Sequence, residues 1–374
     1  MAGVTILEHE LSELRLLVER QTGILLDCPN SALVAHVAEY LEKHELESTP
    51  ALLDRLRACD QDPSVVPAFL DGVLNVNTGF YRHPGAMNAL ARMVVPQIYA
   101  RKSEDGPCTL RIWSAGCGTG EEPYSIAMAL CDPSSNGNGN GNGSGGKECK
   151  EIKDKGAREK EVKEKDGKEK DGKEKNSSAG NGGVDSSSVP APPATKDWSV
   201  HIVGTDLLPS AIETAERGLY PQSALTGLPP ATIRACFSKI GVSNGAATGS
   251  SETTTSPNGS ANGNGSSNGN GSTAHLLVKP RLRSLVTFNT MNLTKPVYIG
   301  RFDCIFCMDV LPHLSRAQRI ALLERLHLYL EPGGYLFLSQ TEKLSTANLN
   351  FRSETFDGYT YHRKPLAASA AYGR

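Results

Sequence analysis

The chain has 374 residues, of which 39% are hydrophobic and 21% charged, and its formal net charge at neutral pH is -2. A balance this close to neutral gives no general preference for nucleic acid or for an anionic membrane surface. The first residues, MAGVTILEHELSELR, contain early acids and no long apolar run, so we expect neither a signal peptide nor membrane insertion. The nine cysteines are odd in number and follow no disulfide framework, which favours reduced thiols and a cytoplasmic protein.

Two low-complexity tracts interrupt the chain. Residues 133–196 contain SSNGNGNGNGSGG and a repeated DGKEK, and residues 243–274 are rich in Gly, Ser, Asn and Thr. Such sequence cannot bury enough apolar area to offset the entropy of ordering, so both tracts are predicted to be disordered insertions. Lysines of the first tract alternate with acids, which favours a solvated spacer over a nucleic-acid arm. The remaining 278 residues suffice for one large or two ordinary domains.

The N-terminal part is predicted to be helical. Apolar residues recur at helical spacing in ILEHELSELRLLVERQTG, SALVAHVAEYLEKHEL and TPALLDRLRACDQ. Ser31 and Thr49 are placed as N-caps of the second and third of these helices. We therefore expect a small all-α domain over residues 1–73, and a second domain over residues 74–374.

The second domain alternates between strands and helices. After an amphipathic helix that ends near Arg101, the predicted order is strand 109–115, helix 121–131, strand 198–204, helix 209–217, strand 285–291, strand 302–308, helix 315–329 and strand 334–339. This alternation predicts an α/β fold with a doubly wound, mostly parallel sheet that is covered by helices on both faces. The region of about 219–284 fits the alternation poorly and is expected to form a small appended subdomain.

A glycine-spaced turn follows the apolar run TLRIWS. The sequence SAGCGTGEEPYS, residues 114–125, has three glycines at alternate positions, which permit positive φ and a close approach of a ligand to the backbone. Glu121 and Glu122 come directly after them, where they would repel a pyrophosphate and so disfavour a nicotinamide dinucleotide. S-adenosylmethionine fits better, because it is cationic and has no phosphate. Glycines alone are weak support, and a plain connecting turn is the alternative.

Asp206 is the candidate for the acid that binds a cofactor ribose. It lies 86 residues after Gly120, which is far more than the spacing of about 20 expected in such folds. Removing the 64 residues of the first insertion leaves 22, which restores that spacing. The alternative role for Asp206 is to cap the helix that starts near Pro209.

Several motifs together resemble one family. They are NVNTGFYR at 75–82, RIWSAGCGTGEEPYSIAMAL, GTDLLPSAIETAERGLYP, VTFNTMNL, FDCIFCMDVL and LEPGGYLFLSQTEKL. With these the chain resembles the CheR-type chemoreceptor glutamate O-methyltransferases. The resemblance implies a class I S-adenosylmethionine-dependent methyltransferase domain with an inserted β-subdomain, behind a small helical N-terminal domain. It also implies the cytoplasmic signalling domains of chemoreceptors as partners, and we expect a monomer.

The resemblance also implies roles for individual residues. Arg82 is the expected catalytic residue, lying with Thr78 near the transferable methyl group, although a solvated surface arginine is the alternative. Glu122 is expected to contact the cofactor, or else to complement its helix dipole. Asn292 is expected to border the adenine, or else to be a turn residue. The full set of expected cofactor-binding residues is Thr78, Arg82, Gly116, Gly118, Glu122, Asp206, Asn292, Leu293, Asp309 and Val310.

Two departures from the family concern the acceptor. An R-N-V-L-I-Y-F-like run is replaced here by MDVLPHL, residues 308–314, where Asp309 could still bind the methionyl ammonium and His313 could orient an acceptor or simply be exposed. The helix SALVAHVAEYLEKHE offers His36 and Lys43 but no arginine for an acidic receptor. The second insertion interrupts the β-subdomain region, so docking on a receptor tail is not expected.

The predicted reaction is direct displacement, in which a glutamate carboxylate attacks the sulfonium methyl group. The carboxylate is already ionised at neutral pH, so no general base is needed. A same-fold methyltransferase with another protein or small-molecule acceptor, and a cofactor-binding signalling module without catalysis, are the alternatives. No metal site is expected, because Cys304 and Cys307 lie inside an apolar strand-like run.

Overall fold

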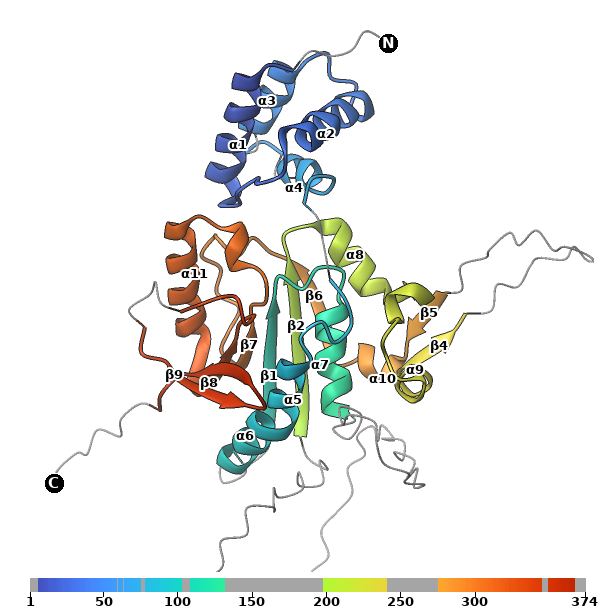
Figure 1. Ribbon diagram of the computed structural model, residues 1–374, viewed down its shortest axis with the longest axis vertical. Helices are drawn as coiled ribbons and strands as arrows, with labels where there is room; N and C mark the ends of the chain where they lie inside the picture. The colour runs from blue at the N-terminus through green and yellow to red at the C-terminus, as the bar shows by residue number, and fades with distance from the viewer. Residues whose placement is uncertain are drawn as a thin grey trace, which may run out of the picture. The chain divides into compact units, whose positions relative to one another are not determined.

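The structure is a computed structural model that describes residues 6–58, 60–62, 64–74, 78–102, 108–131, 198–240, 275–344 and 349–366 (Figure 1). Both predicted insertions, 133–196 and 243–274, lie outside these residues, as do Asn75, Val76 and Asn77 of the NVNTGFYR motif. Within the described ranges, no helix combines the length and the apolar character that crossing a membrane requires.

The described residues of the N-terminal part form four helices: α1 (Glu8–Thr22), α2 (Asn30–Lys43), α3 (Thr49–Arg57) and α4 (Val65–Leu70). Their apolar faces meet in one hydrophobic cluster that includes Leu14, Val18, Leu33, Leu52 and Phe69. Such burial of one face is what stabilises helices that are too short to persist alone.

The two predicted N-caps are wrong. The N-cap of α2 is Pro29, two residues before Ser31, and the N-cap of α3 is Ser48, one residue before Thr49. Neither N-cap side chain makes a capping hydrogen bond. Prolines explain both starts, because Pro29 before α2 and Pro50 in the first turn of α3 fix φ where a helix begins. Thr49 is buried instead of capping.

A seven-stranded sheet forms the centre of the second part. Its strands are β1 (Cys108–Ala115), β2 (Trp198–Asp206), β6 (Val286–Thr290), β7 (Phe302–Phe306), β8 (Leu330–Phe337), β9 (Arg352–Phe356) and β10 (Tyr359–Arg363). The spatial order is β6-β2-β1-β7-β8-β10-β9. The first five strands are parallel, and β10 pairs antiparallel with both β8 and β9. The strand order reverses direction between β1 and β7, which is where ligands bind in such sheets.

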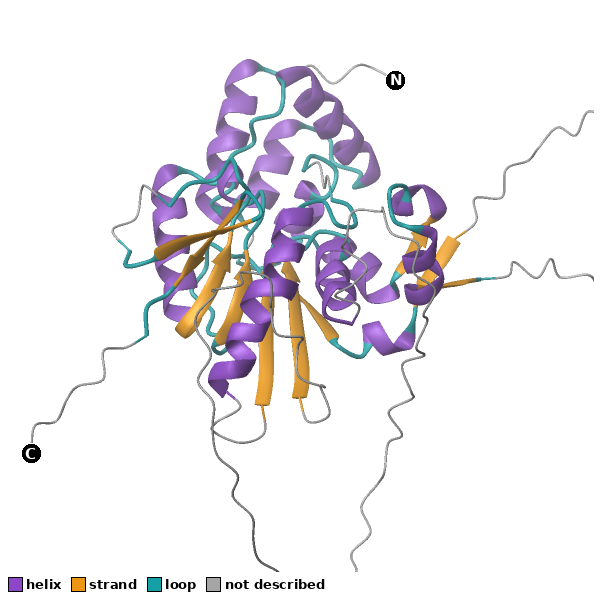
Figure 2. Ribbon diagram, turned by 60° about the horizontal axis from the view of Figure 1, so that its bottom comes forward, coloured by secondary structure: helices purple, strands orange, loops and turns teal. Residues whose placement is uncertain are grey.

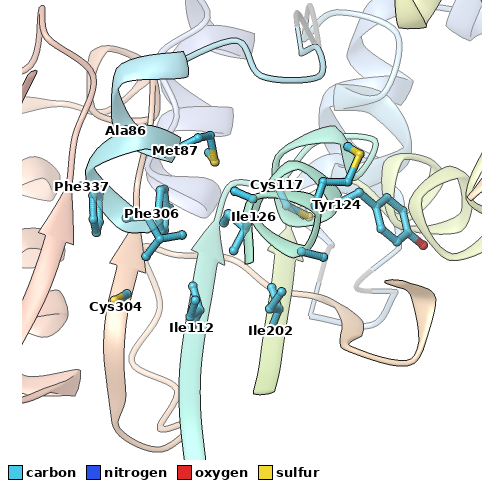
Figure 3. Packing of buried hydrophobic residues seen from close by; sticks show 14 of the residues in the cluster. Ala86, Met87, Ile112, Cys117, Tyr124, Ile126, Ile202, Cys304, Phe306 and Phe337 are labelled. Carbon is cyan, nitrogen blue, oxygen red and sulfur yellow. The ribbon is translucent and has the colours of Figure 1, made fainter. Parts of the chain in front are cut away.

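Helices cover both faces of this sheet (Figure 2). They are α5 (Pro84–Ala89), the π-helical turn η1 (Leu90–Val94), α6 (Val95–Lys102), α7 (Glu121–Cys131), α8 (Pro209–Arg217), α10 (Pro280–Arg283), the short η4 (Leu311–His313) and α11 (Arg316–Tyr329). Neighbouring strand residues belong to opposite clusters. Ile112 and Phe306 pack with Ile126 of α7 on one face (Figure 3), whereas Trp113 and Ile305 pack with the leucines of α11 on the other. The doubly wound, mostly parallel fold expected from the sequence is therefore confirmed.

A second, three-stranded sheet lies within the region expected to form a β-subdomain. Strands β3 (Leu219–Pro221) and β4 (Phe237–Lys239) pair antiparallel with β5 (His275–Val278), and η3 (Gln222–Leu225) and α9 (Pro230–Cys236) connect β3 to β4. Phe80 packs edge-on against Tyr220 and Phe237 of this sheet, with ring centroids 4.9 and 5.3 Å apart. The small sheet thereby supports the segment that carries Arg82. The exact domain boundaries, 1–73 and 74–374, remain a prediction.

The last parallel strand and the C-terminal hairpin differ from the expectation. Strand β8 begins at Leu330 instead of residue 334, because Leu330 pairs with Phe302 and the ladder then shifts register before Cys304. The β9–β10 hairpin was not predicted, since RSETF and YTYHR are short and largely polar.

Gly120 allows a comparison that separates backbone strain from packing. It has φ of 95°, and an added Cβ would lie 2.7 Å from the Ala215 Cβ and 3.0 Å from the Tyr220 hydroxyl. Gly227 has φ of 99° with open space around it. Both substitutions to alanine cost about 1 kcal/mol for the positive φ. Gly120→Ala should cost about 1–3 kcal/mol more, because it overpacks the site.

The measurement is urea unfolding of the two variants and the wild type. Gly120→Ala should unfold at a clearly lower urea midpoint than Gly227→Ala, with similar slopes for all three proteins. Equal midpoints for the two variants would show that the contact of the glycine turn with α8 and β3 adds no constraint.

Candidate functional site

One cavity of about 410 Å³ opens at the carboxyl ends of β1, β2, β6 and β7. This volume lies within the range of about 300–1,000 Å³ that is typical of small-molecule sites. The cavity is bordered by the loops after these strands and by the segment of residues 78–83. The structure brings all ten predicted cofactor-binding residues to its wall: Thr78, Arg82, Gly116, Gly118, Glu122, Asp206, Asn292, Leu293, Asp309 and Val310.

The glycine turn is held between the ends of two other strands. Gly116 and Gly118 have φ of 85° and 54°, as the spacing of the glycines predicted. The backbone N–H groups of Gly116 and Cys117 donate to the Thr205 carbonyl at the end of β2, over 2.8 and 2.9 Å. On the opposite side, a Cβ on Gly116 would lie 2.5 Å from Cγ2 of Val310. Only glycine therefore allows the β7 loop to approach the β1 turn this closely.

Asp206 joins the glycine turn to the start of α8. Its Oδ2 accepts from the Gly118 N–H over 2.9 Å, and its Oδ1 accepts from the Leu208 N–H over 3.0 Å. Burial raises the pKa of Asp206, and these backbone hydrogen bonds oppose the shift. Asp206 makes no N-cap of α8, whose N-cap position is Leu208. A carboxylate oxygen can accept more than one hydrogen bond, so Asp206 can also bind ligand hydroxyls.

The two glutamates after the glycines have different positions. Glu122 borders the cavity and accepts from the Ser114 hydroxyl over 2.7 Å. Glu121 is buried away from the cavity wall and accepts from the Thr119 hydroxyl over 2.7 Å. Burial raises the pKa of Glu122 to about 7, with a further upward effect of the charges of Asp309 and Glu342, although the Ser114 hydrogen bond acts in the opposite direction. Of the pair, Glu122 is the carboxylate that can meet a ligand.

Ser125 attaches the segment of Arg82 to α7. Its hydroxyl donates to the Glu121 carbonyl over 2.6 Å and accepts from the Tyr81 N–H over 2.9 Å. Tyr81 has φ of 51°, a backbone conformation that non-glycine residues rarely adopt. The last residue of the GEEPYS hexapeptide thus holds the turn from which Arg82 reaches the cavity.

Asp309 meets two cationic or ionisable side chains at one oxygen. Its Oδ2 accepts from Nε of Arg82 over 3.0 Å and lies 2.9 Å from Nε2 of His83. Burial raises the pKa of Asp309, but hydrogen bonds from His83 and Ser339 and the charges of His83 and Arg82 together hold that pKa below its ordinary value. Asp309 is therefore ionised at neutral pH.

Glu342 supports the Asp309 turn and was not among the predicted site residues. Asp309 has φ of 57°. Glu342 accepts from the N–H groups of Leu311 over 2.9 Å and Asp309 over 3.3 Å, and from Ser339 N–H over 2.9 Å. The only sequence signal for Glu342 is its position a few residues after a buried strand. His83 was missed too, because nothing local indicates a partner 226 residues away.

Asn292 has the turn role that the sequence left open. Its Oδ1 accepts from the N–H and the hydroxyl of Thr294, over 2.9 and 2.8 Å. Arg325 of α11 donates to the carbonyls of Leu293 and Thr294, both over 2.7 Å. The turn of residues 292–294 is consequently fixed from both sides while Asn292 and Leu293 border the cavity.

The wall of the cavity matches a cation that has hydroxyls and an apolar part but no phosphate. Three carboxylates, Glu122, Asp206 and Asp309, face one guanidinium, and the Arg82 charge is already paired with Asp309. Leucine, methionine and valine side chains provide the apolar area. These properties fit S-adenosylmethionine, and together with the strand order they define a class I S-adenosylmethionine-dependent methyltransferase.

Comparison with known proteins shows what the chain is similar to. The family model described as "CheR methyltransferase, SAM binding domain" matches residues 76–140 and 266–359. Chemotaxis protein methyltransferase 1 of Pseudomonas aeruginosa is 25% identical over 334 residues, which cover 88% of this chain and 89% of the relative. The chemotaxis protein methyltransferase of Vibrio parahaemolyticus is 24% identical over 348 residues, which cover 92% and 93% of the two chains. The chain is therefore similar to the chemotaxis protein methyltransferases over most of its length, and its second domain is similar to the SAM-binding domain of the CheR family.

A similar solved structure is that of magnesium protoporphyrin IX methyltransferase from Synechocystis PCC 6803 with bound SAM. It has a TM-score of 0.26 and 12% sequence identity, and the match covers 77% of this chain and 84% of that one.

The raised pKa of Glu122 predicts pH-dependent cofactor binding. A cation bound beside Glu122 favours the ionised carboxylate, so binding releases a proton when the pH lies below the pKa of about 7 in the free protein. Affinity for S-adenosylmethionine should therefore rise with pH, by up to about tenfold per unit below that pKa, and level off above it. Titration calorimetry between about pH 6 and about pH 8 measures this slope and the proton release.

Glu122→Gln is the control variant, because it keeps an oxygen for the Ser114 hydroxyl but cannot titrate. It should bind more weakly, with a flat pH profile and less proton release. A slope in this variant as steep as that of the wild type would rule out Glu122 as its source.

Proposed function

We propose that the protein transfers the methyl group of S-adenosylmethionine to glutamate side chains of chemoreceptor-type signalling proteins and forms methyl esters, as in chemosensory adaptation. The observation that carries this proposal is Arg82, whose guanidinium stands at the wall of the cavity that holds the carboxylates suited to the cofactor. Arginine binds carboxylates with paired hydrogen bonds, which suits an acidic acceptor. The names of the relatives, chemotaxis protein methyltransferases, support the same acceptor class.

The residues of the wall divide into groups with separate tasks. Asp206 would accept from ribose hydroxyls, and Asn292 and Leu293 would border the adenine. Glu122 and Asp309 would face the cationic methionyl part, with Thr78, Val310 and the glycine turn completing the pocket. The Thr78 hydroxyl also bonds the Glu121 carboxyl and so connects its segment to α7.

The reaction requires the protein mainly to orient the acceptor and the cofactor. Bound S-adenosylmethionine supplies an electrophilic methyl group on its sulfonium. A glutamate carboxylate is ionised at neutral pH, so no residue has to remove a proton. Arg82 is held by its Nε bond to Asp309, which fixes the plane of the guanidinium. We assign the guanidinium of Arg82 to the acceptor carboxylate, whose alignment and loss of water provide the rate acceleration.

Met308 stands where the family pattern has an arginine. Its side chain is largely buried, and its sulfur lies 3.8 Å from the hydroxyl of Tyr359. Met308 also borders the cavity, where it offers an apolar side chain and no cationic group to an acceptor. Arg82 and His83 supply the cationic groups on this side of the cavity through their contacts with Asp309. His313 borders the cavity and is exposed, which leaves it available to an entering side chain.

In this proposal the protein acts as a monomer on the cytoplasmic signalling domain of a receptor. The cytoplasmic location and the monomeric state are part of this proposal.

Arg82→Ala tests the orienting role. Methyl transfer should fall by about 100-fold or more, whereas cofactor affinity should change by less than about threefold, because the carboxylates that bind the cofactor remain. Single-turnover assays and titration calorimetry measure the two quantities. Arg316→Ala is the matched control, since Arg316 is exposed and outside the cavity wall. Parallel losses of activity and affinity would contradict this assignment.

The acceptor is tested with labelled S-adenosylmethionine and purified receptor signalling domains. Label transferred to glutamate should be released as methanol by mild base, since a methyl ester is labile and an N-methyl group is not. Replacing the labelled glutamates by alanine should abolish the signal. Base-stable label, or label on other proteins only, would favour a different acceptor, and cofactor binding without any transfer would favour a signalling module.

A further inference from the structure

The loop between α1 and α2 reaches the cavity. Ile24 borders the cavity together with Leu293, Leu314 and Leu74. Ile24 packs against the hydrophobic cluster of the central sheet and α11, whereas the apolar residues of α1 pack in the cluster of the N-terminal helices. The side chain of Ile24 thus belongs to the wall of the site although its chain segment belongs to the helical part.

Hydrogen bonds hold this loop at one part of the cavity rim. The N–H of Leu25 donates to the His313 carbonyl over 2.8 Å, and Ile24 and Leu314 form an isolated antiparallel bridge. These contacts fix the loop to the turn that follows β7 and carries Asp309.

A second attachment joins the loop to the turn after β6. The Thr294 hydroxyl lies 2.8 Å from the Thr22 carbonyl and shares its one proton between this carbonyl and Oδ1 of Asn292. Gly23 ends α1 with φ of 76°, and a Cβ there would lie 2.5 Å from Cγ2 of Thr294. Backbone and side chain are therefore closely fitted at this point. Residues 22–25, which we call the rim loop, connect the turn of Asn292 to the turn of His313.

We propose that the rim loop is part of the cofactor site and that Ile24 is a cofactor-binding residue. Its aliphatic side chain completes an apolar wall with Leu293 and Leu314, and a flat, weakly polar ring such as adenine is the part of the cofactor that gains most from such a wall. The two attachments keep Ile24 in place without requiring the loop to be ordered by the ligand. This inference rests on the proposed function, because it takes S-adenosylmethionine as the ligand.

The experiment measures binding of S-adenosylhomocysteine, which carries the adenine and needs no acceptor. Ile24→Ala should weaken binding by about tenfold, mainly through faster dissociation, because apolar contact area is lost. Leu16→Ala, at a residue of α1 with 53% exposure, is the control and should bind like the wild type. Calorimetry gives the affinity and stopped-flow displacement gives the dissociation rate.

A second pair of variants tests the attachment to the β6 turn. Thr294→Val removes the hydroxyl that bonds both the Thr22 carbonyl and Oδ1 of Asn292, so it loosens the rim loop together with the turn of residues 292–294 and should weaken binding several-fold. Thr294→Ser keeps that hydroxyl and should restore wild-type affinity. Thermal unfolding by circular dichroism identifies variants whose folding is impaired. If Thr294→Val is impaired, the comparison of Thr294→Ser with the wild type still provides a test.

The outcomes separate this inference from the function on which it rests. Wild-type protein that binds S-adenosylhomocysteine while Ile24→Ala and Thr294→Val bind it equally well would overturn the rim loop as a binding element and leave the proposed function intact. A wild-type protein without affinity for S-adenosylhomocysteine would overturn both. Weakened binding in both variants, with normal binding in Leu16→Ala and Thr294→Ser, supports the assignment.

Discussion

The gathering of carboxylates at one edge of the sheet is the constraint on which the rest of the site depends. Glu122, Asp206, Asp309 and Glu342 lie around the ends of β1, β2, β7 and β8, where burial disfavours their charged forms. Each has its own hydrogen-bond donors, from a hydroxyl, from backbone N–H groups or from Arg82 and His83. A cationic ligand stabilises such a set further, whereas a phosphate would add repulsion.

The requirements of these carboxylates explain the unusual backbone of the site. Gly118 turns its N–H toward Asp206, and Asp309 adopts positive φ while Glu342 accepts from the turn around it. Tyr81 also has positive φ, and its N–H donates to Ser125 as the segment delivers Arg82 to Asp309. Strain of this kind persists only where surrounding contacts fix it. The glycine turn and the Arg82 segment are therefore parts of one hydrogen-bonded unit around the cavity.

The sequence was sufficient for features that depend on local pattern or fixed spacing. Helices 121–131 and 209–217 were predicted to the residue. Removing the insertion from the distance to Gly120 singled out Asp206, which borders the cavity, while its ribose-binding role stays a prediction. Features that depend on distant partners were missed. His83 gains a role only because the fold brings it to Asp309, and Ile24 gains one because its loop pairs with the β7 turn. No periodic pattern of apolar residues in either segment indicates such contacts.

In the proposed reaction, the pairing of Arg82 with Asp309 decides how an acceptor carboxylate is recognised. An unpaired guanidinium would attract any anion, including phosphate. The Nε bond to an ionised Asp309 neutralises much of the charge of Arg82, but it keeps the orientation of the guanidinium hydrogen bonds. Both partners are more than one third exposed, so their mutual attraction is screened by water and contributes modest stability. The ion pair therefore matters more for the orientation of the guanidinium than for the stability of the fold. An acceptor carboxylate would then be selected by its geometry against the guanidinium plane, which accords with a reaction whose barrier is lowered by alignment.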